Sequence, residues 1–351
     1  MLKKALSLLT ATVVLGAVLC SCAPKKDEQK ITVNGKQYGA SQSVLNIGDY
    51  NVSLDFFRYC YLAVKSGMLQ ADATIDFSKK ENADKLSSEV LSETKRMFAT
   101  LELAKKYKYT LSKEELAEID STMKGAFDSA GNSADYNALL EENNLTSAVY
   151  RKALEINALS TKMAETLFGT DKKTNKIVFS KEDAVKGYSD SHARFMNMYF
   201  VAAELNEQGM PLSAAEVEKN KADAKKKADA ALKEIKNGAT FADTMKKYMG
   251  KEAYENDLQS YYDAAAISES LGYDLTGLKV GETSEIIFSQ GAYFIIHRLE
   301  NDVKYLTSIV DDVAKVYSEQ RYEEELSKIS DSLEVFETEL YKEIVFDSFG
   351  K

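Results

Sequence analysis

Helical spacing of apolar residues dominates the first half of the chain. In the segment 83–107, Met97, Leu101 and Ala104 recur at intervals of four and three residues, as one face of an α-helix requires. Ser112 and Glu115 have the spacing of a capping box that begins the next helix. Further helices are predicted at 53–62, 113–128, 133–142 and 146–167. Only a short strand within 44–52 precedes them, so we expect an all-helical region after it.

The pattern changes after the polar segment 170–175. A capped helix from Ser180 leads into ARFMNMYFVAAE, in which two sets of apolar side chains alternate as in a strand buried on both faces. A Lys- and Ala-rich helix from Ser213, a short helix after Thr240 and a tyrosine-rich loop follow. Two apolar strands joined by a turn at 289–291 complete the region. The order strand, helix, helix, loop, strand, turn, strand predicts a small α/β domain.

The last part of the chain returns to a helical pattern. Apolar residues from Leu306 to Tyr317 form a stripe at helical spacing, which needs a partner surface. The segment 335–346 (VFETELYKEIVF) favours a closing strand or an extended segment. Together with the two preceding regions, this pattern predicts an α+β fold class.

The N-terminus has the pattern of an exported protein. Lys3 and Lys4 precede an apolar run, 5–19, which is too short for a comfortable membrane span. The sequence that follows resembles a bacterial lipobox, which implies that removal of a signal peptide, 1–21, leaves Cys22 as a lipidated N-terminus. Cys20 is the weaker candidate, because bulky Leu19 would precede the cut. The alternatives are a plain signal peptide or an uncleaved anchor helix.

Composition agrees with an extracytoplasmic globular protein attached through lipid. Of 351 residues, 44% are hydrophobic, which suffices for a sizeable core. The formal net charge of −10 argues against nucleic acid as a partner and against electrostatic adhesion to a membrane. We therefore expect the lipid on Cys22 to make the membrane attachment. The polar residues after it predict a lipidated tether over 22–43.

Residues that carry catalytic or metal chemistry are few. After Cys22 only Cys60 remains, in the aromatic run FFRYCYLAV, and we expect it to be a buried core thiol. Two histidines and one free cysteine do not form a usual zinc site, and the common hydrolase and phosphate-loop motifs are absent. We expect no metal, no cofactor and no catalytic residue of these kinds.

Several segments, taken in order, match one family. They are ARF at 193–195, IKNGATFADTMKKY at 235–248, LKVGE at 278–282 and GAYFIIHRLE at 291–300, preceded by the helical segments 102–116 and 140–154. Over nearly the whole mature chain, the sequence resembles the parvulin-type foldases of the cell envelope, the PrsA and SurA group.

The resemblance implies a domain organisation. It places a helical chaperone domain of the SurA/PrsA N-terminal kind at 44–188 and a parvulin-like domain at 189–301. The segment 302–351 becomes a C-terminal helix and tail that packs back on the N-terminal domain. The chaperone region is then discontinuous, with the parvulin-like domain inserted in it.

The chain departs from the family where the chemistry lies. Active parvulins carry two histidines, whose positions fall at Phe195 or Asn197 and at Phe294 in this sequence. His192 and His297 do not replace them, because side chains alternate between the faces of a strand and both have the wrong parity. We expect both to be ordinary surface or strand-end residues. The glycine-rich loop of the family is also missing, since KEAYENDLQSYYDAAA stands at 251–266.

These observations predict a chaperone for unfolded or exported polypeptides, with an inactive parvulin-like domain. The expected substrate groove comprises Phe195, Asn197, Tyr199, Met245 and Phe294. Tyrosine clusters around 59–61 and 254–262 suit either tolerant binding of unfolded segments or simple closure of the core. Two other functions remain open: a peptidyl-prolyl isomerase with a non-standard site, because the reaction needs no nucleophile, and a dedicated envelope-assembly lipoprotein.

Overall fold

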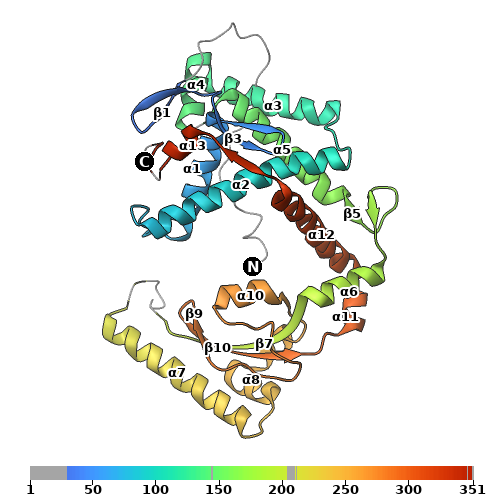
Figure 1. The fold of residues 1–351 in the computed structure, drawn as a ribbon. Coiled ribbons are helices and arrows are strands. Elements are labelled where there is room, and N and C mark those ends of the chain that lie inside the picture. The colour runs from blue at the N-terminus through green and yellow to red at the C-terminus, as the bar shows by residue number, and fades with distance from the viewer. Residues whose placement is uncertain (1–29, 144, 204–209, 211, 346, 350–351) are drawn as a thin grey trace. The chain divides into compact units, whose positions relative to one another are not determined.

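The computed structural model describes residues 30–143, 145–203, 210, 212–345 and 347–349 (Figure 1). It is an α+β structure, as predicted, and its residues divide into two compact units. The first unit takes residues from both ends of the chain, up to Ile177 and from Ser318 onward. The inserted unit is continuous and comprises Val178–Tyr317. No helix in the described part of the chain is long and apolar enough to cross a membrane.

The first unit begins with two hairpins. Strands β1 (Lys30–Val33) and β2 (Lys36–Gly39) pair with each other. A three-stranded antiparallel sheet has the order β11 (Val335–Glu337), β3 (Ser43–Ile47), β4 (Tyr50–Ser53). Two very short strands, β5 (Phe168–Gly169) and β6 (Ile177–Val178), pair separately. The expected single strand within 44–52 is therefore a hairpin, whereas the elements that follow it, over residues 54–166, are all helices, as expected.

The tether prediction is wrong for residues 30–43. Ile31 and Val33 are buried in the core of the first unit, while Lys30 and Thr32 face solvent. Both Lys36 and Tyr38 donate hydrogen bonds to the Glu343 carboxylate, at 2.9 and 2.8 Å. The sequence predicts a tether here because the segment is mostly polar, and its strand β1 has only two inward side chains. Cys22 and the signal segment 1–21 lie outside the described residues.

Five helices form the body of the first unit. They are α1 (Leu54–Ala71), α2 (Lys80–Lys106), α3 (Lys113–Ala130), α4 (Ser133–Glu142) and α5 (Ser147–Thr166). The predicted capping box of Ser112 and Glu115 begins α3. Between α1 and α2, the rings of Phe56 and Phe98 meet edge to face at 5.4 Å. This contact joins α1 and α2 through their apolar faces, as the spacing predicted.

Cys60 lies in this core, as predicted. Its Sγ is 3.6 Å from the Met97 Sδ, and burial raises the pKa of the thiol to about 12. Tyr61, from the same aromatic run, is buried too and contacts Phe349 edge to face. The tyrosines around position 60 thus close the core rather than form an exposed binding surface.

The C-terminal segment completes the first unit. Helix α12 (Val310–Ser332) contains the boundary between the two compact units, at Tyr317 and Ser318. In its second half, Glu323 pairs with Arg96 of α2 at 2.7 Å. Strand β11 then adds to β3, and residues 339–343 of the expected extended segment form α13 (Glu339–Glu343) instead. The chain end therefore packs on elements near the chain start.

The inserted unit is a four-stranded antiparallel sheet between helices. Its strand order is β8 (Tyr261–Asp263), β7 (His192–Val201), β10 (Ala292–Leu299), β9 (Ile287–Ser289). Its helices are α6 (Lys181–Ser191), α7 (Ala214–Lys236), α8 (Phe241–Met249), α9 (Lys251–Asp257), α10 (Ala264–Leu271) and α11 (Val303–Ser308). The expected tyrosine-rich loop thus contains α9, β8 and α10, which are too short to show periodicity. Helices α7 and α8 cover one sheet face, and α10 covers part of the other.

Candidate functional site

Pairing between β7 and β10 brings most of the expected groove residues together. Tyr199 lies directly opposite Phe294, and Asn197 lies opposite Ile296. Directly opposite residues of an antiparallel pair share one face of the sheet. We call this face, with Phe195, Asn197, Tyr199, Phe294, Ile296 and Arg298, the open sheet face. The sequence alternation therefore placed four of the five expected groove residues on one surface.

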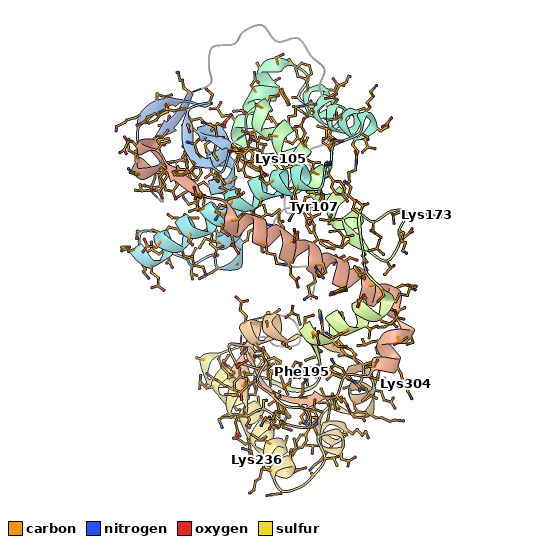
Figure 2. All side chains as sticks on the ribbon, turned by 45° about the vertical axis from the view of Figure 1, so that its right-hand side comes forward. Lys105, Tyr107, Lys173, Phe195, Lys236 and Lys304 are labelled. Atoms are coloured by element: carbon orange, nitrogen blue, oxygen red, sulfur yellow. The ribbon has the colours of Figure 1, made fainter. Side chains whose placement is uncertain are left out.

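The open sheet face is open at one end only. Phe195 (labelled in Figure 2) is fully buried, in a cluster with Leu275 against which side chains of α10 pack. At the other end, Tyr199 is 50% exposed and Val201 is 60% exposed. Phe294 is half-buried between these regions. Phe195 was expected to contact substrate, but it forms part of the core under this face.

Met245 was wrongly placed in the groove. It is buried on the opposite side of the sheet, in the core that α7 and α8 form with Met196, Met198 and Phe200. Strand parity explains the error, because α8 packs on the face that carries the even-numbered residues of β7. The sequence of a helix does not reveal which face of a sheet the helix packs on. The position of Met245 could therefore not be predicted from the sequence.

The strand register also resolves which β7 residue lies near Phe294. The sequence left Phe195 and Asn197 as alternatives. Asn197 is the diagonal neighbour of Phe294, a relation that allows side chains to interact. Phe195 lies opposite Arg298, four residues further along β10, and the Arg298 guanidinium is 5.3 Å from the centre of its ring. Asn197 is thus the residue that can act together with Phe294.

Both histidines lie away from the open sheet face. His297 stacks on Phe241 at 4.9 Å on the helix-covered side, so the prediction that it points away from Phe294 is confirmed. His192, at the start of β7, stacks on Tyr188 at 3.9 Å. Burial lowers the pKa of both imidazoles. His192 is therefore a strand-end residue as expected, but it is buried and not at the surface.

Asp257 is a residue of this site that the sequence analysis missed. Its carboxylate accepts hydrogen bonds from the backbone N–H of Asn197 at 2.6 Å and from the Tyr262 hydroxyl at 3.3 Å. Burial raises the pKa of this carboxyl, and the two hydrogen bonds act in the opposite direction. The Oδ1 atom of Asn197 is buried and has no hydrogen-bond partner within the described residues. Asp257 stands in a polar stretch without a motif, so no sequence signal singled it out.

The arrangement suits binding better than covalent chemistry. An exposed tyrosine, a half-buried phenylalanine and an amide lie side by side, with one half-buried carboxyl at the edge of the strand. No group of three or more His, Cys, Asp or Glu side chains that could hold a metal gathers in the described residues. Such a surface offers apolar area with a few hydrogen-bonding groups, which is what an extended polypeptide segment requires.

Comparisons with known proteins give low similarity to one group of solved structures. No protein-family model matches the chain, and no curated protein matches it. The peptidylprolyl isomerase PrsA from Bacillus anthracis is 17% identical, over 68% of this chain and 94% of that chain, with a TM-score of 0.31. PrsA from Bacillus subtilis is 15% identical, over 84% and 93%, with a TM-score of 0.25. PrsA from Bacillus cereus is 12% identical, over 87% and 98%, with a TM-score of 0.28. At these values the function has to be argued from the residues of this chain.

Proposed function

We propose that this chain is a membrane-anchored extracytoplasmic chaperone that binds unfolded or exported polypeptides without isomerase chemistry. The observation that carries the proposal is the exposed end of the open sheet face, where Tyr199 and Val201 project beside Phe294. An exposed apolar cluster on a sheet is a recognisable mark of an interaction surface. Tyrosine adds a polar tip to a large apolar ring, which tolerates varied partners.

Catalysis is the less favoured function for this surface. The positions that resemble the two family histidines hold Phe294 and either Phe195 or Asn197, and neither His192 nor His297 reaches the face. In this proposal the inserted unit has kept its fold and serves as a binding module. The helical first unit supplies the remaining chaperone surface, and a lipid on Cys22 supplies the membrane anchor.

One observation favours a second candidate, an active peptidyl-prolyl isomerase with a non-standard site. Asp257 presents a carboxyl with a raised pKa next to Asn197, the diagonal neighbour of Phe294. Rotation about a prolyl bond requires stabilisation of a twisted amide rather than a nucleophile. An apolar face with a protonatable carboxyl at its edge meets that requirement in principle.

Aggregation of an unfolded client protein tests the chaperone proposal. Residues 23–351 at several-fold excess should suppress light scattering from a reduced, unfolded client. Tyr199→Ala combined with Phe294→Ala should remove most of this suppression. Phe336→Ala is the matched control, since Phe336 is 59% exposed but lies on β11 of the first unit. If residues 23–351 do not suppress aggregation at all, the chaperone proposal is wrong.

Refolding of a proline-limited protein separates the candidates. A higher yield at an unchanged rate supports a chaperone without isomerase activity. A faster slow phase that Asp257→Asn abolishes supports the isomerase. If neither rate nor yield changes, while a native partner is recovered from membranes, the dedicated envelope-assembly function replaces both.

A further inference from the structure

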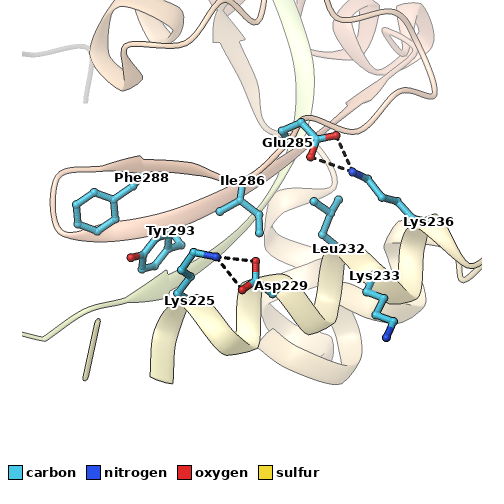
Figure 3. A pocket seen from close by; sticks show the side chains of 9 residues that line it. All are labelled: Lys225, Asp229, Leu232, Lys233, Lys236, Glu285, Ile286, Phe288 and Tyr293. Carbon is cyan, nitrogen blue, oxygen red and sulfur yellow. Dashed lines mark hydrogen bonds and ion pairs between the residues drawn. The ribbon is translucent and has the colours of Figure 1, made fainter. Parts of the chain in front are cut away.

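A groove of about 520 Å³ lies on the inserted unit, between α7 and the edge strand β9 (Figure 3). It is separate from the exposed end of the open sheet face, because Phe288 and Tyr293 belong to the helix-covered parity of the strands. The residues that line it are Lys225, Asp229, Leu232, Lys233, Lys236, Glu285, Ile286, Phe288 and Tyr293.

Among the residues that the structure describes, strand β9 pairs along one edge of its backbone only. It pairs with β10 on one side and is the last strand of the sheet on the other. The hairpin has a two-residue turn, Gln290 and Gly291, with φ of 49° and 74°. In such a hairpin the residues that flank the turn, Ser289 and Ala292, exchange backbone hydrogen bonds. Pairs then alternate, so Phe288 and Tyr293 form a pair without backbone hydrogen bonds.

The other side of β10 gives the same result independently. The N–H of Ala202 donates to the carbonyl of Gly291 at 2.9 Å. By the same alternation, Tyr293 exchanges its backbone hydrogen bonds with Phe200 of β7. The N–H and C=O of Phe288 therefore point away from the sheet. They form an open strand edge directly beside the groove, because the Phe288 side chain lines it.

The groove has an apolar floor and a positive balance of charge. Its floor includes Leu232 and Ile286, and the side chain of Phe288 is 49% exposed. Figure 3 shows two ion pairs on either side of Leu232, one from Lys225 to Asp229 at 2.8 Å and one from Lys236 to Glu285 at 2.7 Å.

Two lysines add unbalanced charge to these pairs. Lys233 forms no ion pair with any residue that the structure describes, and neither does Lys221, whose ammonium lies 5.1 Å from the centre of the Phe288 ring. A positive site on a chain with a formal net charge of −10 is complementary to an acidic ligand.

We propose that the edge of β9 binds an extended acidic peptide segment as an additional strand. The main chain of the segment hydrogen-bonds to the N–H and C=O of Phe288, and alternate side chains lie against Leu232 and Ile286. Strand addition of this kind takes affinity from the main chain and specificity from alternate side chains. This inference rests on the proposed chaperone function, because the bound segment is part of a client polypeptide. It adds that the segment is extended and acidic.

A synthetic peptide of alternating valine and threonine with one central glutamate tests the site. Binding of the labelled peptide to residues 23–351 is measured by fluorescence anisotropy. We expect at least about tenfold weaker binding when alternate peptide nitrogens are N-methylated, because each methyl group removes a main-chain donor. Equal binding of the methylated peptide would overturn the proposal.

Variants of the chain locate the bound peptide. Phe288→Pro removes the outward N–H, which an edge strand tolerates, and it should weaken binding about tenfold or more. Lys221→Glu with Lys233→Glu, two surface substitutions that leave the backbone intact, should weaken the glutamate peptide and strengthen a lysine version of it. Phe336→Ala, an exposed substitution on β11 of the first unit, is the control and should bind the peptide as the wild type does. Unchanged binding in both the Phe288→Pro and the double lysine variant overturns the proposal.

Two further outcomes are decisive. If the peptide fails to bind and the chain instead forms a dimer that Phe288→Pro dissociates, the occupant is a second copy of this chain and the peptide proposal is wrong. If the peptide fails to bind while aggregation suppression persists, only the groove proposal is overturned. If the peptide binds but aggregation is not suppressed, the groove stands and the chaperone proposal falls.

Discussion

The two faces of the β7–β10 pair differ in burial, although residues next to each other in the sequence form them. Met198 is fully buried under α7 and α8, whereas Tyr199, the next residue, is 50% exposed. On the helix-covered face, Ala224, Ala228 and Ala231 let the long helix α7 approach the sheet closely. On the open sheet face, the eight-residue helix α10 covers only one end. The strand alternation sets the two faces, and the length of the covering helix decides how much of each face is buried.

The largest expected effect is a difference in stability between these two neighbours. Met198→Ala should lower the free energy of unfolding by about 2–5 kcal/mol, because it leaves a cavity in a closed core. Tyr199→Ala should change it by about 0.5 kcal/mol or less, as exposed substitutions usually do. Urea unfolding of residues 23–351 measures both values. If both variants lose a similar amount of unfolding free energy, the open sheet face around Tyr199 is covered rather than exposed.

Acidification is expected to weaken the helix-covered side. Burial lowers the pKa of His192 and His297, so the unfolded chain binds protons more readily than the folded chain as pH falls. Stability should therefore be lost between about pH 7 and pH 5, on either side of the ordinary histidine pKa of about 6.5. The Asp263 carboxylate acts in the opposite direction on the pKa of His192, whereas burial alone lowers the pKa of His297.

Thermal unfolding at a series of pH values checks this expectation. The double variant His192→Gln, His297→Gln should show a flatter dependence over that range, whatever its stability at neutral pH. A dependence as steep as that of the wild type would assign the acid sensitivity to carboxyl groups instead.

The smallest effect concerns Asp257, at the edge of the open sheet face. Burial raises its pKa, so the folded chain holds this proton more tightly than the unfolded chain. Its contribution therefore favours folding at low pH and is lost as pH rises through the folded pKa. Relative to Asp257→Asn, the wild type should gain stability between about pH 7 and pH 4. Urea unfolding of both proteins at these two values measures the difference, and a relative loss by the wild type at pH 4 would reverse the sign.

Strand alternation made the open sheet face largely predictable from sequence. Phe195, Asn197 and Tyr199 share a parity, and that parity holds in the structure. What the sequence did not contain was the pairing register, which decided that Asn197 and not Phe195 neighbours Phe294. The sequence also did not show on which face of the sheet α8 packs, and for this reason Met245 was assigned to the wrong face.

Long periodic elements were predicted well, and short ones were not. The capping box at Ser112 and the helix 133–142 match α3 and α4. By contrast, β1 has only two inward residues, Ile31 and Val33, too few for a periodic signal to separate from a polar tether. Asp257 was missed for a related reason: its role comes from a tertiary contact with the backbone of Asn197, which leaves no local pattern.

The pairing of β11 with β3 has a consequence for the order in which the protein is made. Val335 pairs with Ile47, so the sheet of the first unit joins residues separated by most of the chain. A polypeptide synthesised or exported from its N-terminus presents β3 with an open edge until residue 337 has arrived, whereas the inserted unit is complete at residue 317. Contacts of high sequence separation form slowly, and domains generally fold as units. The part of the chain that emerges first is therefore the last to finish folding.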